Sequence, residues 1–251
     1  MDLHLMGKRA IVTGGSRGIG RAIAHALAEE GVDVVIAART REPLNQAATE
    51  IATATNRRVI GIAADMADDN SVDALVEGAV RALGGVDILV NNAAAPGAGK
   101  AAKIGDVVTA NLLTDVDAKV GGYIRAARAV APHMAAAGYG RIVNIGGLAA
   151  RRTGNYVSAL RNAAISAITK NLADELGPRG VGAIAIHPGF LRTPGADAAA
   201  EARAQGATSY GRLIGFEEIA SLVVLLASPR TAVLNGDTLQ AVGGVRGVID
   251  Y

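Results

Sequence analysis

The stretch Lys8-Arg-Ala-Ile-Val-Thr13 runs directly into Gly14-Gly-Ser-Arg-Gly-Ile-Gly20, and this junction decides the fold of the chain. The first part has the apolar pattern of a buried strand, and residues 21–30 after the glycines have the period of a helix. Glycines allow a sharp turn and a close approach of the backbone to a diphosphate, and a helix N-terminus offers free N–H groups. The spacing Gly-x-x-x-Gly-x-Gly departs from the common Gly-x-Gly-x-x-Gly, and a plain strand-to-helix corner is the alternative. The junction therefore predicts the phosphate-binding turn of a nucleotide site.

The same alternation of strand and helix patterns continues along the chain. Apolar runs typical of buried parallel strands occupy residues 10–13, 33–38, 59–63, 86–90, 141–145, 181–186 and 237–242. Helical patterns occupy residues 43–55, 71–83, 119–136 and 158–176. Because strands that alternate with helices are joined by right-handed crossovers, we predict an α/β fold with a Rossmann-like, doubly wound parallel sheet. No linker or break in composition divides the chain, so we expect a single nucleotide-binding domain over residues 1–251.

The composition narrows the class of protein. Half of the residues are hydrophobic but only 3% are aromatic, so the core must consist mainly of Ala, Val, Ile and Leu. The formal net charge is only +2 and the charges are scattered, so no basic stripe for nucleic acid is expected. No apolar run has the length of a membrane span, the first residues lack a signal-peptide pattern, and a chain without cysteine is compatible with a reducing cytoplasm. We therefore expect a cytoplasmic protein without a membrane segment, and we expect no metal site.

Two segments are expected at the carboxyl ends of the strands, where ligands bind in sheets of this kind. Residues 93–103 are rich in Gly, Ala and Pro and are predicted to form a loop. Residues 193–215 lie between a Pro-Gly turn and the next helical segment. We predict that they form a mobile lid over a substrate.

Three further motifs follow predicted strands. Asp65 follows the third strand, Asn91-Asn92-Ala93-Ala94 closes the fourth, and Pro188-Gly189-Phe-Leu-Arg-Thr193 follows the sixth. Together with residues 13–20 they resemble the short-chain dehydrogenase/reductase family in order, spacing and length, over essentially the whole chain. The resemblance implies a bound NAD(P) with its diphosphate on residues 14–20, a small-molecule substrate, and a homodimer or homotetramer.

The resemblance also implies roles for individual residues. Asp65 would lie beside the adenine, Asn91 would line the ribose side, and Thr193 would contact the nicotinamide amide. The residues predicted to bind the cofactor are Gly14, Ser16, Arg17, Gly18, Ile19, Gly20, Arg39, Asp65, Asn91, Pro188, Gly189 and Thr193. The alternatives are an ordinary loop acid for Asp65 and a cap at the strand end for Asn91.

Charge favours NADP(H) as the cofactor. An acidic residue at the end of the second strand would bind both ribose hydroxyls and repel a 2′-phosphate. This chain instead has Ala38-Arg39-Thr40 there, with a second guanidinium at Arg17, and two arginines can bind a phosphate through charge-assisted hydrogen bonds. We therefore predict NADP(H), with NAD(H) possible. Solvated surface arginines are the alternative interpretation.

The expected reactive centre departs from the family pattern. The family uses a Tyr as proton donor, a Lys four residues later, a Ser that polarises the carbonyl, and an Asn on the preceding helix. Counting from Pro188-Gly189 places Ser158 at the Tyr position and Asn162 at the Lys position. The Ser position is Gly147, and counting from Pro132-His-Met134 places Lys119 at the Asn position. We therefore predict an atypical member that lacks all four groups.

Four residues are candidates for an altered proton path. Tyr156 could reach the cleft because the loop before it is shorter than usual, although an aromatic that packs at the helix start is the alternative. Lys119 could act as a base or cation if desolvation lowers its pKa, or it could point along the helix to solvent. Ser158 has a hydroxyl without an evident base beside it, and Asn162 could hydrogen-bond a ribose hydroxyl.

Three functions remain open from the sequence. The first is an oxidoreductase that binds NADP(H) and acts on a carbonyl or alcohol by an altered proton path. The second is a non-redox enzyme, such as a lyase, hydratase or isomerase, that uses the same cleft. The third is a catalytically silent nucleotide-binding subunit that supports an active relative in a mixed oligomer.

Overall fold

Within residues 1–94 and 101–247, which the computed structural model describes, seven strands form one sheet in the order β3-β2-β1-β4-β5-β6-β7. The strands are β1 (Arg9–Thr13), β2 (Asp33–Ala38), β3 (Val59–Ala63), β4 (Ile88–Asn91), β5 (Gly140–Ile145), β6 (Val181–Pro188) and β7 (Thr238–Ala241). Every pair of neighbouring strands is parallel, so the carboxyl ends of all strands lie at the same edge. The predicted single-domain α/β fold with a Rossmann-like, doubly wound sheet is confirmed.

The direction in which strands are added to the sheet reverses at β1. On one side β1 pairs with β2, with Val12 opposite Ile36, and on the other side it pairs with β4, with Val12 opposite Val90. The connections that leave these strands therefore diverge to opposite faces of the sheet. Such a reversal opens a crevice at the carboxyl ends of the strands, and ligands of doubly wound sheets bind there.

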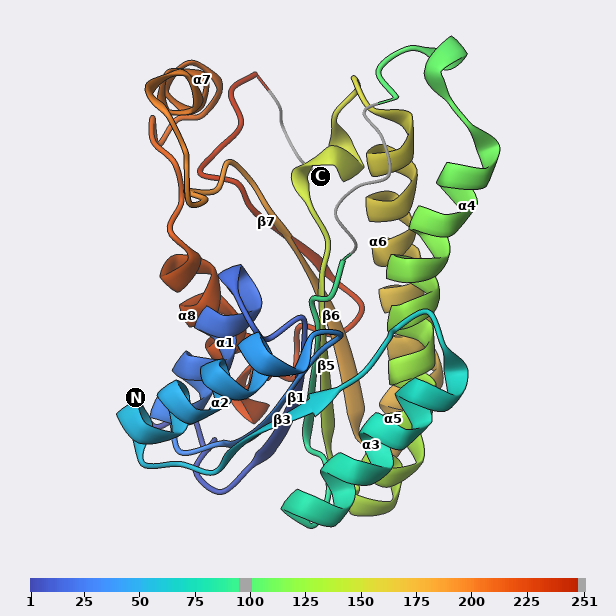
Figure 1. The fold of residues 1–251 in the computed structure, drawn as a ribbon, viewed down its shortest axis with the longest axis vertical. Coiled ribbons are helices and arrows are strands. Elements are labelled where there is room, and N and C mark those ends of the chain that lie inside the picture. The colour runs from blue at the N-terminus through green and yellow to red at the C-terminus, as the bar shows by residue number, and fades with distance from the viewer. Residues whose placement is uncertain (95–100, 248–251) are drawn as a thin grey trace.

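Helices cover both faces of the sheet (Figure 1). One face carries α1 (Gly18–Glu29), α2 (Arg41–Thr55) and α8 (Phe216–Ala227). The other face carries α3 (Asp69–Leu83), α4 (Thr109–Val116), α5 (Gly122–Ala137) and α6 (Tyr156–Leu176). The short helix α7 (Ala198–Ala207) lies apart from both layers, beyond the carboxyl ends of the strands (Figure 1). No helix among the described residues is both long and apolar enough to cross a membrane.

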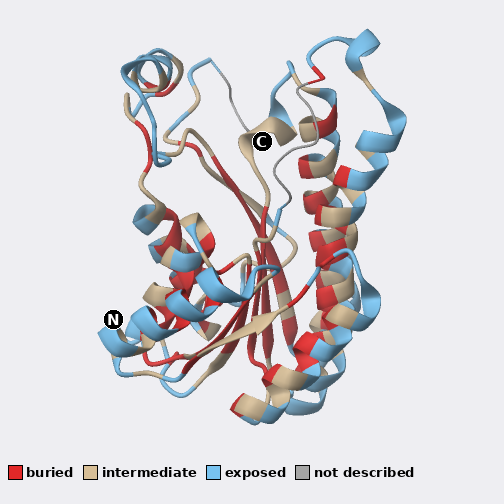
Figure 2. Cartoon of the chain, in the orientation of Figure 1, coloured by how far each residue is buried: buried red, intermediate tan, exposed pale blue. Residues whose placement is uncertain are grey.

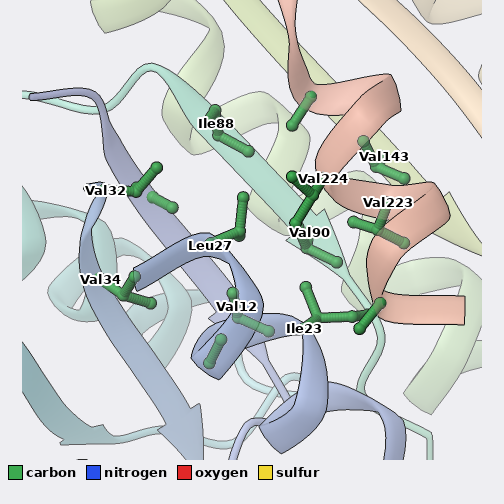
Figure 3. Packing of buried hydrophobic residues seen from close by; sticks show 14 of the residues in the cluster. Val12, Ile23, Leu27, Val32, Val34, Ile88, Val90, Val143, Val223 and Val224 are labelled. Carbon is green, nitrogen blue, oxygen red and sulfur yellow. The ribbon is translucent and has the colours of Figure 1, made fainter. Parts of the chain in front are cut away.

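The core occupies both faces of the sheet, and buried residues concentrate on the strands and on the inward sides of the helices (Figure 2). Val12 of β1 packs with Ile23 of α1 and Val223 of α8 (Figure 3). Its neighbour Ile11 belongs to the cluster on the opposite face, with Leu75 of α3. Because strand side chains alternate between faces, a sheet covered on both sides needs continuous apolar runs, which is the pattern that predicted these strands.

The observed helices differ most from the prediction in the layer that holds α4 and α5. The helix predicted for residues 119–136 is longer, because α4 already begins at Thr109 and continues through a π-helical turn, Asp117–Gly121, into α5. Of the described residues of α4, Asp115 alone is buried. With only eight residues, α4 is shorter than the window over which a periodic apolar pattern can be recognised, and the sequence does not predict it.

The two segments predicted at the carboxyl ends differ in how far the structure describes them. The loop predicted for residues 93–103 falls partly outside the described residues, which exclude 95–100. The segment 193–215 contains α7, which the sequence did not predict. Backbone bridges join Ile214, near the end of this segment, to Leu191 just before its start, and join Thr208 within the segment to Val245.

Candidate active site

A cavity of about 440 Å³ opens at the carboxyl ends of β1 to β4, where the strand order reverses. The glycine turn after β1 and the residues that follow β2, β3 and β4 form its walls. Its lining includes the predicted cofactor residues Gly14, Ser16, Arg17, Gly18, Arg39 and Asp65, together with Asn92 and Ala118. The cavity thus lies where the sequence predicted a nucleotide.

The glycine turn leaves the N-terminus of α1 open toward this cavity. Gly14 and Gly18 have φ angles of 69° and 58°, a region that favours glycine. A Cβ on Gly18 would meet nothing nearer than the Phe216 ring at 4.0 Å, so space beside the backbone is free for a ligand. Arg17 precedes the first residue of α1, and no described side chain caps the N–H groups there. These free donors and the positive end of the helix dipole fit a diphosphate.

Gly20 closes the turn by packing against its beginning. A Cβ on Gly20 would lie 2.3 Å from the Gly14 carbonyl oxygen and 2.5 Å from Asn92 Nδ2. We expect Gly20→Ala to lower the free energy of unfolding by about 1–3 kcal/mol, and to weaken nucleotide binding because the turn must move outward. Equilibrium unfolding and nucleotide titration measure the two effects. The control is Gly105→Ala, because a Cβ on Gly105 meets nothing within 4 Å; equal losses in both variants would contradict the packing argument.

Two guanidinium groups face the same cavity. Arg17 and Arg39 both line it, and neither forms an ion pair with a described residue. Asp65 also lines the cavity, and its Oδ1 accepts a hydrogen bond from the Ala67 N–H at 3.0 Å. The end of β2 carries Arg39 directly after Ala38, with no carboxylate at that point. This distribution of charge suits a ribose that carries an additional phosphate.

Two of the predicted cofactor residues have side chains that pack inside the protein, and their contact with a cofactor stays a prediction. Ile19 is partly buried and packs against the hydrophobic core. Asn91 is fully buried, and its Nδ2 donates to Asn144 Oδ1 at 2.9 Å and to the Tyr123 carbonyl oxygen at 3.3 Å. The next residue, Asn92, lines the cavity because β4 ends at Asn91.

The segment from Pro188 to Thr193 lies at the end of β6, outside the walls of this cavity. Pro188 is buried as the last residue of β6, and a Cβ on Gly189 would lie 2.7 Å from Val242 Cα. Thr193 is exposed. The structure therefore does not bring these residues against the nucleotide cavity, and the contact of Thr193 with a nicotinamide stays a prediction.

Lys119 belongs to a second polar cluster beside the cavity. It lies in the π-helical turn, directly after Ala118 of the cavity wall, and only 5% of its surface is exposed. Its Nζ donates to Asn162 Oδ1 of α6 at 2.9 Å and to the Gly146 carbonyl oxygen at 3.2 Å. Asn162 Nδ2 donates to the Ser158 carbonyl oxygen at 2.8 Å, which fixes the amide atom that faces the lysine. Lys119 therefore points into the protein and not to solvent.

Burial and charge both weaken the proton affinity of Lys119. Desolvation lowers the pKa of its ammonium, the positive charge of Arg161 lowers it further, and Asp115 opposes this, so that the pKa is about 7. A buried amine with this pKa can hold or release a proton at neutral pH, which is the property required of a general acid–base group.

The remaining candidate side chains differ in their distance from this cluster. A Cβ on Gly147 would lie 3.3 Å from Asn162 Nδ2, so Gly147 borders the cluster. Ser158 lies one turn before Asn162 on α6 and is partly buried. Tyr156 is the first residue of α6 and is 50% exposed, and its hydroxyl forms no hydrogen bond with a described residue. The structure joins Lys119 to Asn162, and Ser158 contacts Asn162 through its carbonyl oxygen, whereas no hydrogen bond among the described residues links Tyr156 to this cluster.

Sequence reasoning missed one feature next to Lys119, an ion pair between Asp115 of α4 and Arg161 of α6. The four-residue spacing from Asp115 to Lys119 puts both residues on one helix face, but no local signal indicates the partner of Asp115 on α6. His187 also lies nearby at the end of β6, and burial together with the charges of Lys119 and Arg151 lowers its pKa to about 4. Within the described part of the chain, no group of three or more His, Cys, Asp or Glu side chains could hold a metal ion.

Comparisons with known proteins agree with this geometry. A family model described as short chain dehydrogenase matches residues 8–204. The chain is 38% identical to the short-chain reductase protein NovJ of Streptomyces niveus, over 94% of this chain and 92% of the relative. It matches the L-sorbose reductase from Gluconobacter frateurii, complexed with NADPH and L-sorbose, with a TM-score of 0.92 and 30% identity over 99% of this chain and 100% of the other. An NAD⁺-bound xylitol dehydrogenase matches with a TM-score of 0.88 and 26% identity over 96% and 100% of the two chains.

Proposed function

Because this chain belongs to the short-chain dehydrogenase family, we propose that it is an NADP(H)-binding oxidoreductase that interconverts a carbonyl compound and its alcohol. Two of the relatives are reductases, and one of them was crystallised with NADPH and a sugar. In this proposal Lys119 holds and transfers the proton, in place of the tyrosine that the family uses. The chain is then an atypical member that keeps the reaction and changes the proton path.

The observation that supports the proton path is the 2.9 Å hydrogen bond between Lys119 Nζ and Asn162 Oδ1. Lys119 occupies the position where the resemblance implies an asparagine, and Asn162 occupies the position where it implies a lysine. The two residue types are exchanged between helices that face each other, so an ammonium group is kept at the same contact. In this proposal the site keeps a proton donor, Lys119, although Ser158 stands at the position of the family's tyrosine and Gly147 at that of its serine.

Each group of the site has a chemical task in this proposal. The glycine turn and the N-terminus of α1 bind the diphosphate, and Arg17 with Arg39 bind a 2′-phosphate. When bound, the nicotinamide supplies a hydride to the carbonyl carbon or accepts one from the alcohol. Lys119 donates a proton to the carbonyl oxygen during reduction and accepts it during oxidation. Asn162 holds the amine in place through its Oδ1.

The preference for NADP(H) over NAD(H) rests on charge, because relatives of this chain were crystallised with either cofactor. Arg39 stands where an NAD-binding site would carry an acid, and Arg17 lines the same cavity. Neither arginine has an acidic partner among the described residues. Both can therefore bind the 2′-phosphate of NADP(H), whereas the 2′-hydroxyl of NAD(H) offers them no negative charge.

Residues 193–215 are proposed as the substrate lid. The segment follows β6 at the carboxyl edge, and α7 within it is held by the Arg192–Glu201 ion pair at 2.8 Å. We also propose a homodimer or homotetramer. Leu113 of α4, Ile124 of α5 and Leu160 of α6 are large apolar residues exposed on the outer helix layer, and burial against another subunit would cover them.

Reduction is expected to lose rate as the pH rises through about 7, because the pKa of Lys119 is lowered to about 7 by burial and by Arg161, and reduction needs the protonated amine. Oxidation of the alcohol needs the neutral amine, so its rate is expected to fall as the pH drops through the same value. The kcat of both directions, measured on either side of neutral pH, checks this. Profiles that stay flat through neutrality in both directions would contradict proton transfer by Lys119.

The proposed function is tested by titrating the purified protein with NADPH and NADH, followed by a panel of carbonyls and alcohols. We expect NADPH to bind more tightly and the nicotinamide absorbance to change with at least one substrate. Turnover without a change in absorbance would favour a lyase, hydratase or isomerase. Nucleotide binding without any turnover would favour a silent partner subunit, and failure to bind either nucleotide would rule out the whole proposal.

A further inference from the structure

A buried ion pair connects α4 to α6 beside the proposed reactive centre. Arg161 Nη1 lies 2.7 Å from Asp115 Oδ1 and 2.8 Å from Asp115 Oδ2. The side chain of Asp115 is 1% exposed and that of Arg161 is 14% exposed. The pair is therefore shielded from water and from the screening that weakens surface ion pairs.

Such a pair contributes little to stability by itself. Removing two charges from water is unfavourable, and apolar residues of similar volume often serve a fold equally well. The Nε of Arg161 is moreover buried and has no hydrogen-bond partner among the described residues. An incompletely satisfied guanidinium at this place points to a role other than stabilising the two helices.

The position of the pair relative to Lys119 indicates that role. Asp115 precedes Lys119 by four residues, so both side chains lie on the same side of the helix that runs from α4 into the π-helical turn. Arg161 directly precedes Asn162, which accepts the hydrogen bond from Lys119. The ion pair and the Lys119–Asn162 contact thus join the same two helical segments, through residues four positions apart on one segment and adjacent on α6.

We propose that Asp115 and Arg161 are positioning residues for Lys119: the ion pair fixes the distance between the two helical segments and holds two opposite charges near the lysine. This inference rests on the proposed function, in which Lys119 transfers the proton. Neither residue needs to touch substrate or cofactor. They act on the position of Lys119 through the contact between the helices, and on its protonation through their two opposite charges.

The charges that face Lys119 come from several elements. Arg161 of α6 disfavours the ammonium form and Asp115 of its own helix favours it. His187 of β6 stays neutral near pH 7 because burial and the nearby cations Lys119 and Arg151 lower its pKa to about 4. Tyr123, whose ring centre lies 5.8 Å from Lys119 Nζ, is also neutral because burial raises the pKa of its hydroxyl. Burial is the main cause of the lowered pKa of Lys119, and Asp115 and Arg161 are the charged groups that add to or oppose it.

The test compares variants that remove one charge, both charges or neither. Asp115→Asn leaves the Arg161 cation uncompensated and is expected to lower the pKa of Lys119 by about one pH unit, whereas Arg161→Met leaves the Asp115 anion and is expected to raise it by about as much. The double variant Asp115→Asn/Arg161→Met is expected to return close to the starting value. The readout is the NMR titration of isotope-labelled lysine in the nucleotide-free protein, with the Lys119 signal assigned from its loss in Lys119→Met.

Two further variants separate charge from packing. Arg161→Lys keeps the cation and is expected to keep the titration midpoint of Lys119, even if Arg161→Met does not fold. Asp174→Asn removes an exposed carboxylate of α6, paired with Lys170, and is expected to leave the midpoint unchanged. Shifts in the same direction for Asp115→Asn and Arg161→Met, or an equal shift in Arg161→Lys and Arg161→Met, would overturn the proposal.

The pH profile of carbonyl reduction distinguishes this inference from the proposed function. If the NMR midpoint and the kinetic midpoint shift together in opposite directions in the two single variants, both proposals are supported. If the NMR midpoint shifts as expected and the profile of turnover does not follow it, the ion pair controls Lys119 but Lys119 does not transfer the proton. A midpoint that none of the variants moves would contradict the positioning role alone.

Discussion

Lys119→Met is expected to lower kcat for carbonyl reduction by about 10²–10⁴-fold, which is the usual contribution of a positioned general acid. Methionine fills the same buried space with an apolar chain. The variant therefore has no proton donor at this position, and it avoids the free-energy cost of burying an amine. The nucleotide cavity is formed by other residues, with only the neighbouring Ala118 in its wall, and affinity for NADPH should change little. Steady-state kinetics and nucleotide titration measure the two quantities separately.

Two controls make this expectation specific. Lys170→Met removes an exposed lysine of α6 that pairs with Asp174, and it should leave kcat unchanged. Tyr156→Phe removes the hydroxyl of the other candidate proton donor. Tyr156 is 50% exposed and is the first residue of α6. Full activity in Lys119→Met together with a large loss in Tyr156→Phe would show that the proton path runs through the tyrosine and that the proposal for Lys119 is wrong.

The sheet could be predicted because its strands are buried on both faces. A short continuous apolar run such as residues 33–38 is typical of a strand covered by helices on both sides, and observed β2 has these same bounds. The helix α4 shows the opposite case. Its residues are mostly exposed and its single buried side chain is a charged one, Asp115. An eight-residue helix is too short for hydrophobic periodicity to identify, and the ion pair that joins it to α6 leaves no local signal in the sequence.

The nucleotide site was predictable to the extent that its residues are adjacent in sequence. Gly14, Arg17 and Gly18 form one turn, and a single local motif specifies their geometry. The sequence does not indicate which of Asn91 and Asn92 lines the cavity. Because β4 ends at Asn91, this asparagine faces the interior of the protein and Asn92 faces the cavity.

The contact at the reactive centre required the three-dimensional structure. Counting along the chain placed Lys119 and Asn162 at the altered positions, but 43 residues separate them and either side chain could have pointed elsewhere. The ion pair of Asp115 with Arg161 spans 46 residues in the same way. Charged side chains on two separate helices meet only through tertiary packing, which local patterns do not encode.

Arg39→Asp is expected to shift the ratio of the NADH and NADPH dissociation constants by about 10²–10³-fold toward NADH. The variant loses a charge-assisted bond to the 2′-phosphate, worth roughly 1.5–3 kcal/mol, and adds repulsion between the phosphate and the new carboxylate. It also gains an acceptor for the ribose hydroxyls of NADH. Each tenfold change in the ratio corresponds to about 1.4 kcal/mol, so the expected effect is the sum of these contributions. Fluorescence titration with both nucleotides measures it.

Arg41→Asp provides the matched control, because Arg41 begins α2 on the exposed surface and does not line the nucleotide cavity. It changes the net charge of the protein by the same amount, so a general electrostatic effect would appear in both variants. Since Debye screening weakens exposed charges over about 10 Å at 0.1 M salt, only the residue inside the cavity should alter the preference strongly. If Arg39→Asp leaves the preference unchanged, or if Arg41→Asp changes it as much, a phosphate is not bound by Arg39 and the choice of cofactor must lie elsewhere in the site.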